Sequence, residues 1–208
     1  MKEDGDCHFY RPSEGHGLAH DPLNAIIAPR PIGWISTRAA DGRLNLAPYS
    51  FFNAFCYRPP IIGFSSTGAK DSLANAQATG EFVWNLATRD LADQMNATSA
   101  SVPYGVDEFD LAGLTAAPCR MVSVPRVAES PVNFECKVTD IVQLKNQQGE
   151  TLKAWLTLGE VVGVHIRRNL LKEGVFDTFG AGIIVRAGGV SSYAEIRPDS
   201  RFDMIRPA

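Results

Sequence analysis

The sequence predicts a mainly β protein: an antiparallel barrel with a few short α-helices. Strand-like apolar runs fill most of the chain, from PIGWISTR to TLKAWLTLGEVVGVHI. These runs follow one another through hairpin-type turns, such as the one at Asp41-Gly42. Between the strands only two short segments change to helical spacing, which is too few for the regular alternation of a parallel βαβ sheet.

Size and composition are those of one soluble domain. The chain has 208 residues, of which 45% are hydrophobic and 21% charged, so it can bury one full core but is short for two. Residues 1–20 are rich in Gly, His and charge, and we expect an N-terminal arm there, followed by a single domain over 21–208. The net charge of −3 gives a nucleic-acid partner no electrostatic support.

Neither a membrane span nor an export signal is expected. No apolar run approaches the roughly 18 residues that cross a bilayer, and MKEDGDCHFYRPSEGHG lacks the apolar core of a signal peptide. Cytoplasmic location is the resulting expectation. In that setting four scattered cysteines are expected to be reduced and structural: Cys7, Cys56, Cys119 and Cys136.

The first half of the chain is expected to begin with a short helix in HDPLNAII, with Asp21 as N-cap and Pro22 in the first turn. A strand over PIGWISTR then turns at Asp41-Gly42 into one extended run, NLAPYSFFNAF. IIGFSS is a short buried strand. A helix that starts near Asp71 or Ser72 ends at Gly80.

The second half returns to strands. EFVWNLA is a strand and TRDLADQMNATSA a helix, with Thr88 as its cap. VPYGVDEFDLAGLTAAP is expected to be a loop with one helical turn, its carboxylates Asp107, Glu108 and Asp110 solvated. Residues 126–166 form a long hairpin around NQQGE, and a polar tail follows. Trp34, Trp84 and Trp155 are expected in the core.

Two segments have the residue types of a ligand-binding site. Hydroxyls at Ser65 and Ser66, then Lys70 and a helix start, suit a phosphate, because a helix N-terminus favours an anion. A capped helix on a polar loop explains the same residues equally well. The spacing is not a Walker motif, since Ala69 stands between Gly68 and Lys70.

The second segment is NLAPYSFFN, where Pro48 interrupts strand pairing. Small side chains at Ala47 and Ser50 leave room for a flat ring, and Thr37 and Asn45 add polar contacts. An edge strand with a bulge is the alternative. A flat ring beside a phosphate indicates a mononucleotide-type cofactor, and the absence of G-x-G-x-x-G disfavours a Rossmann dinucleotide site.

The segments PRPIGWIST, NLAPYSFFN, GEVVGVHI and VRAGGVSSY also carry a resemblance. Through them nearly the whole chain resembles the flavin reductase-like, FMN-binding split-barrel family, close to its flavoredoxin-type branch. The resemblance implies an antiparallel, Greek-key split β-barrel that forms a homodimer, with FMN near the subunit interface and FAD as an alternative. The sequence differs from the family's usual pattern at Ala187, where relatives more often have leucine.

The resemblance also implies the cofactor contacts. The flavin ring is expected along Ile35, Ser36, Thr37, Asn45, Ala47, Pro48, Tyr49, Ser50, Phe51, Phe52 and Asn53. The phosphate is expected to meet Ser65, Ser66, Lys70, Asp71 and Ser72. Tyr193 could approach the cofactor, and Arg30 and Arg89 a phosphate or the nicotinamide ribose. No metal site is expected, because the glycines around His16 and His20 leave no helical frame.

The family's usual chemistry implies an NAD(P)H-dependent flavin reductase that takes hydride from NADH or NADPH and serves a partner monooxygenase or electron-acceptor protein. His165 is the candidate proton donor outside the arm, although a histidine that ends an apolar strand is more often structural. Two alternatives stay open: a flavoredoxin-like electron carrier with tightly bound FMN, and a non-catalytic FMN-binding sensor.

Overall fold

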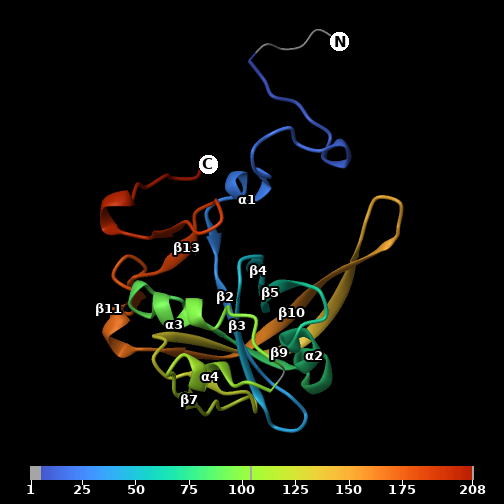
Figure 1. Ribbon diagram of the computed structural model, residues 1–208. Helices are drawn as coiled ribbons and strands as arrows, with labels where there is room; N and C mark the ends of the chain where they lie inside the picture. The colour runs from blue at the N-terminus through green and yellow to red at the C-terminus, as the bar shows by residue number, and fades with distance from the viewer. Residues whose placement is uncertain (1–5, 104, 208) are drawn as a thin grey trace.

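The computed structural model describes residues 6–103 and 105–207, and its main element is a seven-stranded antiparallel sheet (Figure 1). The strand order is β3-β2-β6-β9-β10-β5-β4. In chain order these strands are β2 (Gly33–Arg38), β3 (Leu44–Tyr49), β4 (Phe52–Tyr57), β5 (Pro60–Thr67), β6 (Glu81–Asn85), β9 (Val132–Lys145) and β10 (Thr151–Ile166). The mainly β prediction is confirmed.

The sheet curls so that its two ends meet. Tyr49 on the edge strand β3 packs against Phe64 of β5, with ring centroids 4.8 Å apart. The interior between them is filled by Ile35, Ile62, Phe64, Phe82 and Cys136. Burial of these apolar side chains is the main force that holds the barrel closed.

Smaller pairings complete the β structure. β1 (Arg30–Pro31), β13 (Ile184–Arg186) and β14 (Tyr193–Glu195) form a three-stranded sheet. β7 (Ala116–Ala117) pairs with β8 (Arg126–Val127), and β11 (Leu171–Lys172) pairs with β12 (Val175–Phe176).

The helices are short, as expected. The N-cap of α1 (Leu23–Ile26) is Pro22 and not Asp21 as predicted, although Asp21 Oδ1 accepts the Leu23 N–H at 2.9 Å. α2 (Asp71–Thr79) ends at Gly80 with φ 69°. α3 (Ala92–Ala97) follows the 3-10 turn η2 (Arg89–Leu91), and α4 (Glu108–Leu111) is the expected single turn. Further 3-10 turns are η1 (Pro12–Glu14), η3 (Arg168–Leu170) and η4 (Pro198–Ser200).

The run that was predicted as one strand forms two strands, β3 and β4. NLAPYSFFNAF does not continue as a single run, because the chain bends at Ser50 and Phe51. β3 pairs with β2 and lies at one edge of the sheet, whereas β4 pairs with β5 and lies at the other. Pro48 therefore stands on an edge strand, where its missing N–H breaks no ladder.

A second core layer lies between the sheet and helices α3 and α4. Trp34, Leu46, Met95 and Phe109 pack together there, and the Trp34 Nε1–H donates to Thr98 Oγ1 at 3.0 Å. Trp34 is fully buried, as expected, whereas Trp84 and Trp155 are half-buried. This layer fixes the loop that follows α3 against β3.

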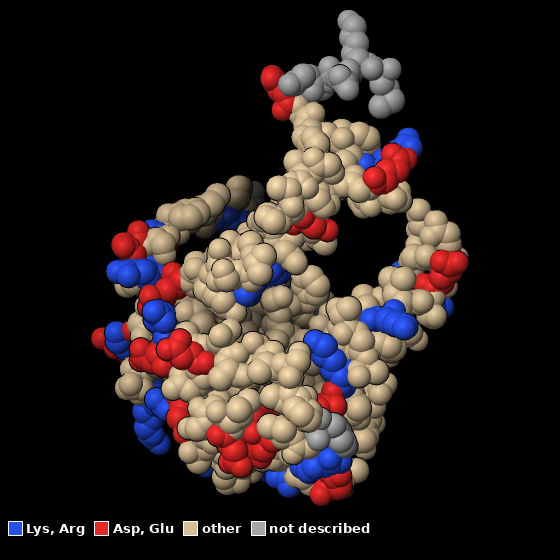
Figure 2. Space-filling model, viewed as in Figure 1, with Lys and Arg blue, Asp and Glu red and all other residues tan. Residues whose placement is uncertain are grey.

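The described part of the arm and the β9–β10 hairpin project from the body and leave an opening between them (Figure 2). Acidic and basic side chains are intermingled on the visible face. The four cysteines are all free, but Cys7 and Cys56 are exposed, so only Cys119 and Cys136 have a packing role. Within the described residues, no helix is long and apolar enough to cross a bilayer.

Candidate functional site

A groove of about 300 Å³ runs between β3 and the start of α2. Its walls combine both segments that the sequence singled out with the loop after α3. The lining residues are Asn45, Ala47, Pro48, Tyr49, Lys70, Asp71, Ser72, Thr98, Ser99, Ala100, Ser101, Val102 and Glu108.

Buried hydrogen bonds hold the two segments together. Asn45 Nδ2 donates to Ser72 Oγ at 2.8 Å and to Thr37 Oγ1 at 3.3 Å. Asn75 Nδ2 donates to the same Thr37 oxygen at 3.1 Å. These four side chains are buried, so the network fixes α2 relative to β2 and β3.

α2 begins without a side-chain cap. Its N-cap residue is Lys70, which has no acceptor atom, and no side chain caps the first turn. The amide groups there carry the positive end of the helix dipole, and the exposed Lys70 adds a full positive charge. The capped-helix interpretation is therefore wrong, and this helix end is suited to an anion.

Tyr49 closes the floor of the groove. Its hydroxyl is buried near Ser72 and Ser66 but meets hydrogen-bond geometry with no described residue. Burial raises the pKa of Tyr49, against a smaller opposite effect of those two hydroxyls. The side chain is therefore a neutral phenol at physiological pH.

The expectation that all three loop carboxylates are solvated is wrong for Glu108. Asp107 caps α4 by accepting the Phe109 N–H at 2.8 Å, and Asp110 is exposed. Glu108 is only 7% exposed, and it accepts the Leu46 N–H of β3 at 3.1 Å. Burial raises the pKa of this carboxyl.

Several expected contacts do not line the groove. Ile35 lies in the barrel core, Ser36 donates to the Pro125 carbonyl at 2.7 Å, and Ser66 donates to the Gly68 carbonyl at 3.0 Å. Ser65, half-buried on β5, donates its backbone N–H to the Phe51 carbonyl.

Phe52 and Asn53 line a separate apolar pocket of about 290 Å³. Phe52 stacks on Trp84 there, with centroids 5.6 Å apart and planes 8° apart. Phe51 is exposed beside Arg30, whose guanidinium otherwise donates to the carbonyls of Asn24 and Ile27. Ser50 lies half-buried at the bend between β3 and β4. The structure thus divides the expected ring contacts between two hollows.

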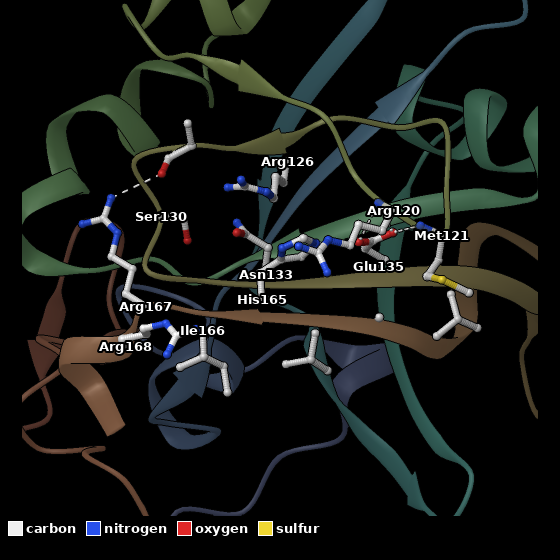
Figure 3. Close-up of a pocket in the computed structure, with 14 residues that line it drawn as sticks. Arg120, Met121, Arg126, Ser130, Asn133, Glu135, His165, Ile166, Arg167 and Arg168 are labelled. Carbon is white, nitrogen blue, oxygen red and sulfur yellow. Dashed lines mark hydrogen bonds and ion pairs between the residues drawn. The ribbon is translucent and has the colours of Figure 1, made fainter. Parts of the chain in front are cut away.

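His165 lies elsewhere, on β10 opposite Asn133 of β9. Its Nε2 is 2.5 Å from Oε1 of Glu135, and the N–H groups of Arg120, Met121 and Val122 also donate to that carboxylate. Burial would raise the pKa of Glu135, but these four donors together hold it below its usual value. The pair lies in a cavity of about 730 Å³ that contains several arginines (Figure 3).

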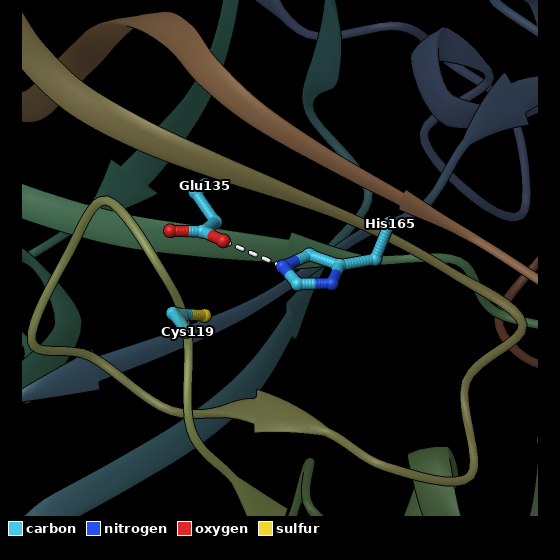
Figure 4. A group of neighbouring side chains, drawn as sticks. All are labelled: Cys119, Glu135 and His165. Atoms are coloured by element: carbon cyan, nitrogen blue, oxygen red, sulfur yellow. Dashed lines mark hydrogen bonds and ion pairs between the residues drawn. The ribbon is translucent and has the colours of Figure 1, made fainter.

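Cys119 completes a cluster with this pair (Figure 4). One potential ligand atom from each residue lies within 4.8 Å of the others. However, both Glu135 oxygens already accept N–H groups, and burial raises the pKa of Cys119 to about 12, so the thiol is protonated. The cluster acts as the anchor of the 120–122 segment.

Comparison with known proteins identifies the fold. Residues 27–181 match the family model described as "Flavin reductase like domain". An uncharacterized protein from Halalkalibacterium halodurans is 34% identical over 172 residues, with 80% of this chain and 82% of the relative covered.

Solved structures agree. Nitrilotriacetate monooxygenase component B from Bacillus cereus is 30% identical with a TM-score of 0.81, covering 90% of this chain and 98% of that chain. Flavoredoxin of Desulfovibrio vulgaris (Miyazaki F), at 21% identity and TM-score 0.71, covers 86% and 91% and shows the same fold. The chain therefore belongs to the flavin reductase-like family of split-barrel proteins, as its sequence motifs indicated.

Proposed function

We propose that this protein is an FMN-dependent oxidoreductase that reduces flavin with NADH or NADPH. Family membership supports the flavin, and the uncapped start of α2 beside Lys70 is the observation that supports a phosphorylated one. FMN carries a single terminal phosphate, which matches one helix end and one lysine. FAD remains the alternative flavin.

The groove residues have defined roles in this proposal. The first-turn amides of α2, Lys70 and Ser72 hold the phosphate, while Asn45 is kept in place by its bonds to Thr37 and Ser72. β3 is an edge strand, so backbone groups next to Pro48 are free of ladder bonds on one side and can meet the flavin. Ala47 and Ser50 leave room for its ring.

When bound, FMN supplies the hydride-accepting ring, and the chain's own residues orient and tune it. Lys70 balances the phosphate charge. Glu108 lies on the β3 side of the groove, and we infer that its carboxylate disfavours the phosphate there. Asp71 is the first residue of α2, so its charge lies at the helix end beside Lys70. His165 is positioned by Glu135 and is not needed as a proton donor at this groove.

A homodimer is part of the proposal. β4 forms one edge of the sheet and is exposed over most of its length, with Phe55 54% and Tyr57 83% exposed. An exposed, aromatic edge strand is a surface that soluble proteins usually cover. A second copy would cover it and bring a partner wall close to the bend at Ser50. Similarity to a monooxygenase component B supports a monooxygenase as the downstream partner.

The absorbance spectrum of the purified protein tests the proposal, followed by anaerobic titration with each nicotinamide nucleotide. We expect yellow protein that bleaches with NADH or NADPH and turns over when FMN is added in excess. A tightly held flavin that neither nucleotide bleaches would instead favour the electron carrier or the sensor. Protein that takes up no flavin from added FMN would overturn the proposal.

A further inference from the structure

The 730 Å³ cavity around His165 is strongly basic and plays no part in the groove described above. It lies between strands β9 and β10 and the segment that leads through β8. Arg120, Arg126, Arg167 and Arg168 line it, and Glu135 is the one acidic residue among the described residues that do. That carboxylate is 1% exposed and carries one negative charge against four guanidinium groups, so the lining keeps a net positive charge.

Three of these arginines lack protein acceptors. The guanidinium groups of Arg120, Arg126 and Arg168 form no hydrogen bond or ion pair within the described parts of the chain. Arg126 Nε is buried and unpaired. Arg167 is different, since it donates to the carbonyls of Ala128 and Glu129. Arg120 and Arg168 are exposed to solvent, so only the buried Arg126 Nε costs free energy while no ligand satisfies it.

The arrangement selects a ligand with more than one anionic group. Arg120 and Arg126 gather near His165 in the middle of the cavity, whereas Arg167 and Arg168 lie toward one end (Figure 3). His165 donates its Nε2–H to Glu135, which leaves Nδ1 available to a ligand. Arginine suits phosphate oxygens because its fork of N–H groups matches them.

One apolar side chain lies at the edge of the cavity: Met121, which is 54% exposed. Val164 and Ile166 flank His165 on β10, so their side chains point to the other face of the strand. A methionine side chain can cover part of a purine ring. A phosphate-sized ion would leave most of 730 Å³ empty, whereas a nucleotide would use both the basic centre and the edge at Met121.

We propose that this cavity binds the diphosphate and base of an adenosine diphosphate group. The group could belong to a free adenine nucleotide or to the nicotinamide dinucleotide. Only the second source rests on the proposed function. Direct binding of ADP does not depend on flavin reduction, so the two proposals can fail separately.

The test is calorimetric titration of the full chain with ADP, in wild type and in Arg126→Gln and Arg168→Gln variants. Each loses one unpaired guanidinium, and we expect each to bind ADP at least about tenfold more weakly. Arg58→Gln is the matched control, because Arg58 is exposed, contacts Tyr57 and lies outside the cavity. Arg168 is exposed, so its variant keeps the test valid if Arg126→Gln fails to fold.

Wild-type protein that does not bind millimolar ADP, or Gln variants that bind as tightly as Arg58→Gln, would overturn the proposal. The two sources are then separated by kinetics with NADH and NADPH. A raised KM with unchanged kcat in Arg168→Gln identifies the dinucleotide. An unchanged KM together with weakened ADP binding identifies a free nucleotide.

Discussion

His165 of β10 donates to Glu135 of β9 across 2.5 Å, and the same carboxylate accepts three backbone amides from the 120–122 segment. One buried carboxylate therefore joins two neighbouring strands to a loop that no regular ladder holds. The histidine ring is held by this bond and lines the arginine cavity. Removing the carboxylate should therefore loosen the loop and the cavity together.

The first prediction concerns stability. Glu135→Gln keeps one oxygen, which can still accept the amides of Arg120, Met121 and Val122, but it removes the negative charge and puts an NH₂ group where His165 needs an acceptor. We expect the free energy of unfolding at pH 7 to fall by about 2–4 kcal/mol, since buried donors lose a charged acceptor. Urea denaturation measures it. A change within 0.5 kcal/mol, on the order of an exposed substitution, would contradict the anchoring role.

The second prediction is the pH dependence of that stability. Because the folded pKa of Glu135 is below its usual value of 4.5, its contribution is fully present above pH 4.5 and lost as pH falls through the folded pKa. Wild-type stability should therefore fall more steeply below pH 4.5 than that of Glu135→Gln. Other shifted carboxylates, such as Asp41 and Asp177, titrate alike in both proteins. Parallel pH profiles would contradict the assignment.

Local signals in the sequence predicted most of the fold. Asp41-Gly42 and Gly80 mark element ends through interactions within a few residues, and both lie where they were expected. Asp21 lies one residue before the N-cap position, which Pro22 occupies. The bend at Ser50 was missed because it depends on which strands pair. Pro48 permits an edge strand but does not say where the chain crosses to the other edge.

The site was harder to predict, because its key contacts join distant segments. From the sequence, Glu108 is predicted to be solvated, because it stands in a loop between Asp107 and Asp110. Only the structure shows that it is buried against β3. The arginine cavity draws on two segments about 40 positions apart, so neither segment looks basic alone. A carboxylate in an apolar strand, as in VNFECKV, was the one available signal for Glu135.

The third prediction tests the barrel interior. A Cβ at Gly159 of β10 would overlap the ring of Phe82, lying 2.7 Å from its Cζ, and that ring is fully buried. Gly159→Ala should therefore cost about 1–3 kcal/mol of unfolding free energy.

Phe82→Leu supplies the control for this overlap, because it shortens the opposing side chain. The double variant should lose less than the sum of the two single losses, as measured by urea denaturation. Strictly additive losses would show that the ring is not what excludes the methyl group.

The fourth prediction concerns the phosphate end of the proposed flavin site. Lys70→Ala removes the positive charge beside the uncapped start of α2, so FMN binding should weaken by about 1–3 kcal/mol. Fluorescence titration of apoprotein with FMN measures it. Lys145→Ala, on the exposed hairpin, should leave the affinity unchanged. Equal affinity of the Lys70 variant and wild type would remove Lys70 from the site.

The fifth prediction concerns the ring end. Ser50 lies at the half-buried bend between β3 and β4, next to the edge-strand residues proposed to meet the flavin ring. Leucine at this position adds a branched apolar side chain where the proposal requires space for a flat ring. Ser50→Leu should therefore abolish the yellow colour of protein reconstituted with FMN while the unfolding transition stays cooperative.

Thr139→Leu, at an exposed position of β9, adds similar apolar bulk away from both hollows and should keep the flavin. The comparison separates steric exclusion from a general effect of surface leucines. Because Ser50 is near the β4 edge, size-exclusion chromatography is run on both variants in parallel. A Ser50→Leu protein that elutes with wild type and retains full flavin absorbance would show that the ring lies elsewhere, with the apolar hollow beside Phe52 and Trp84 as the next site to test.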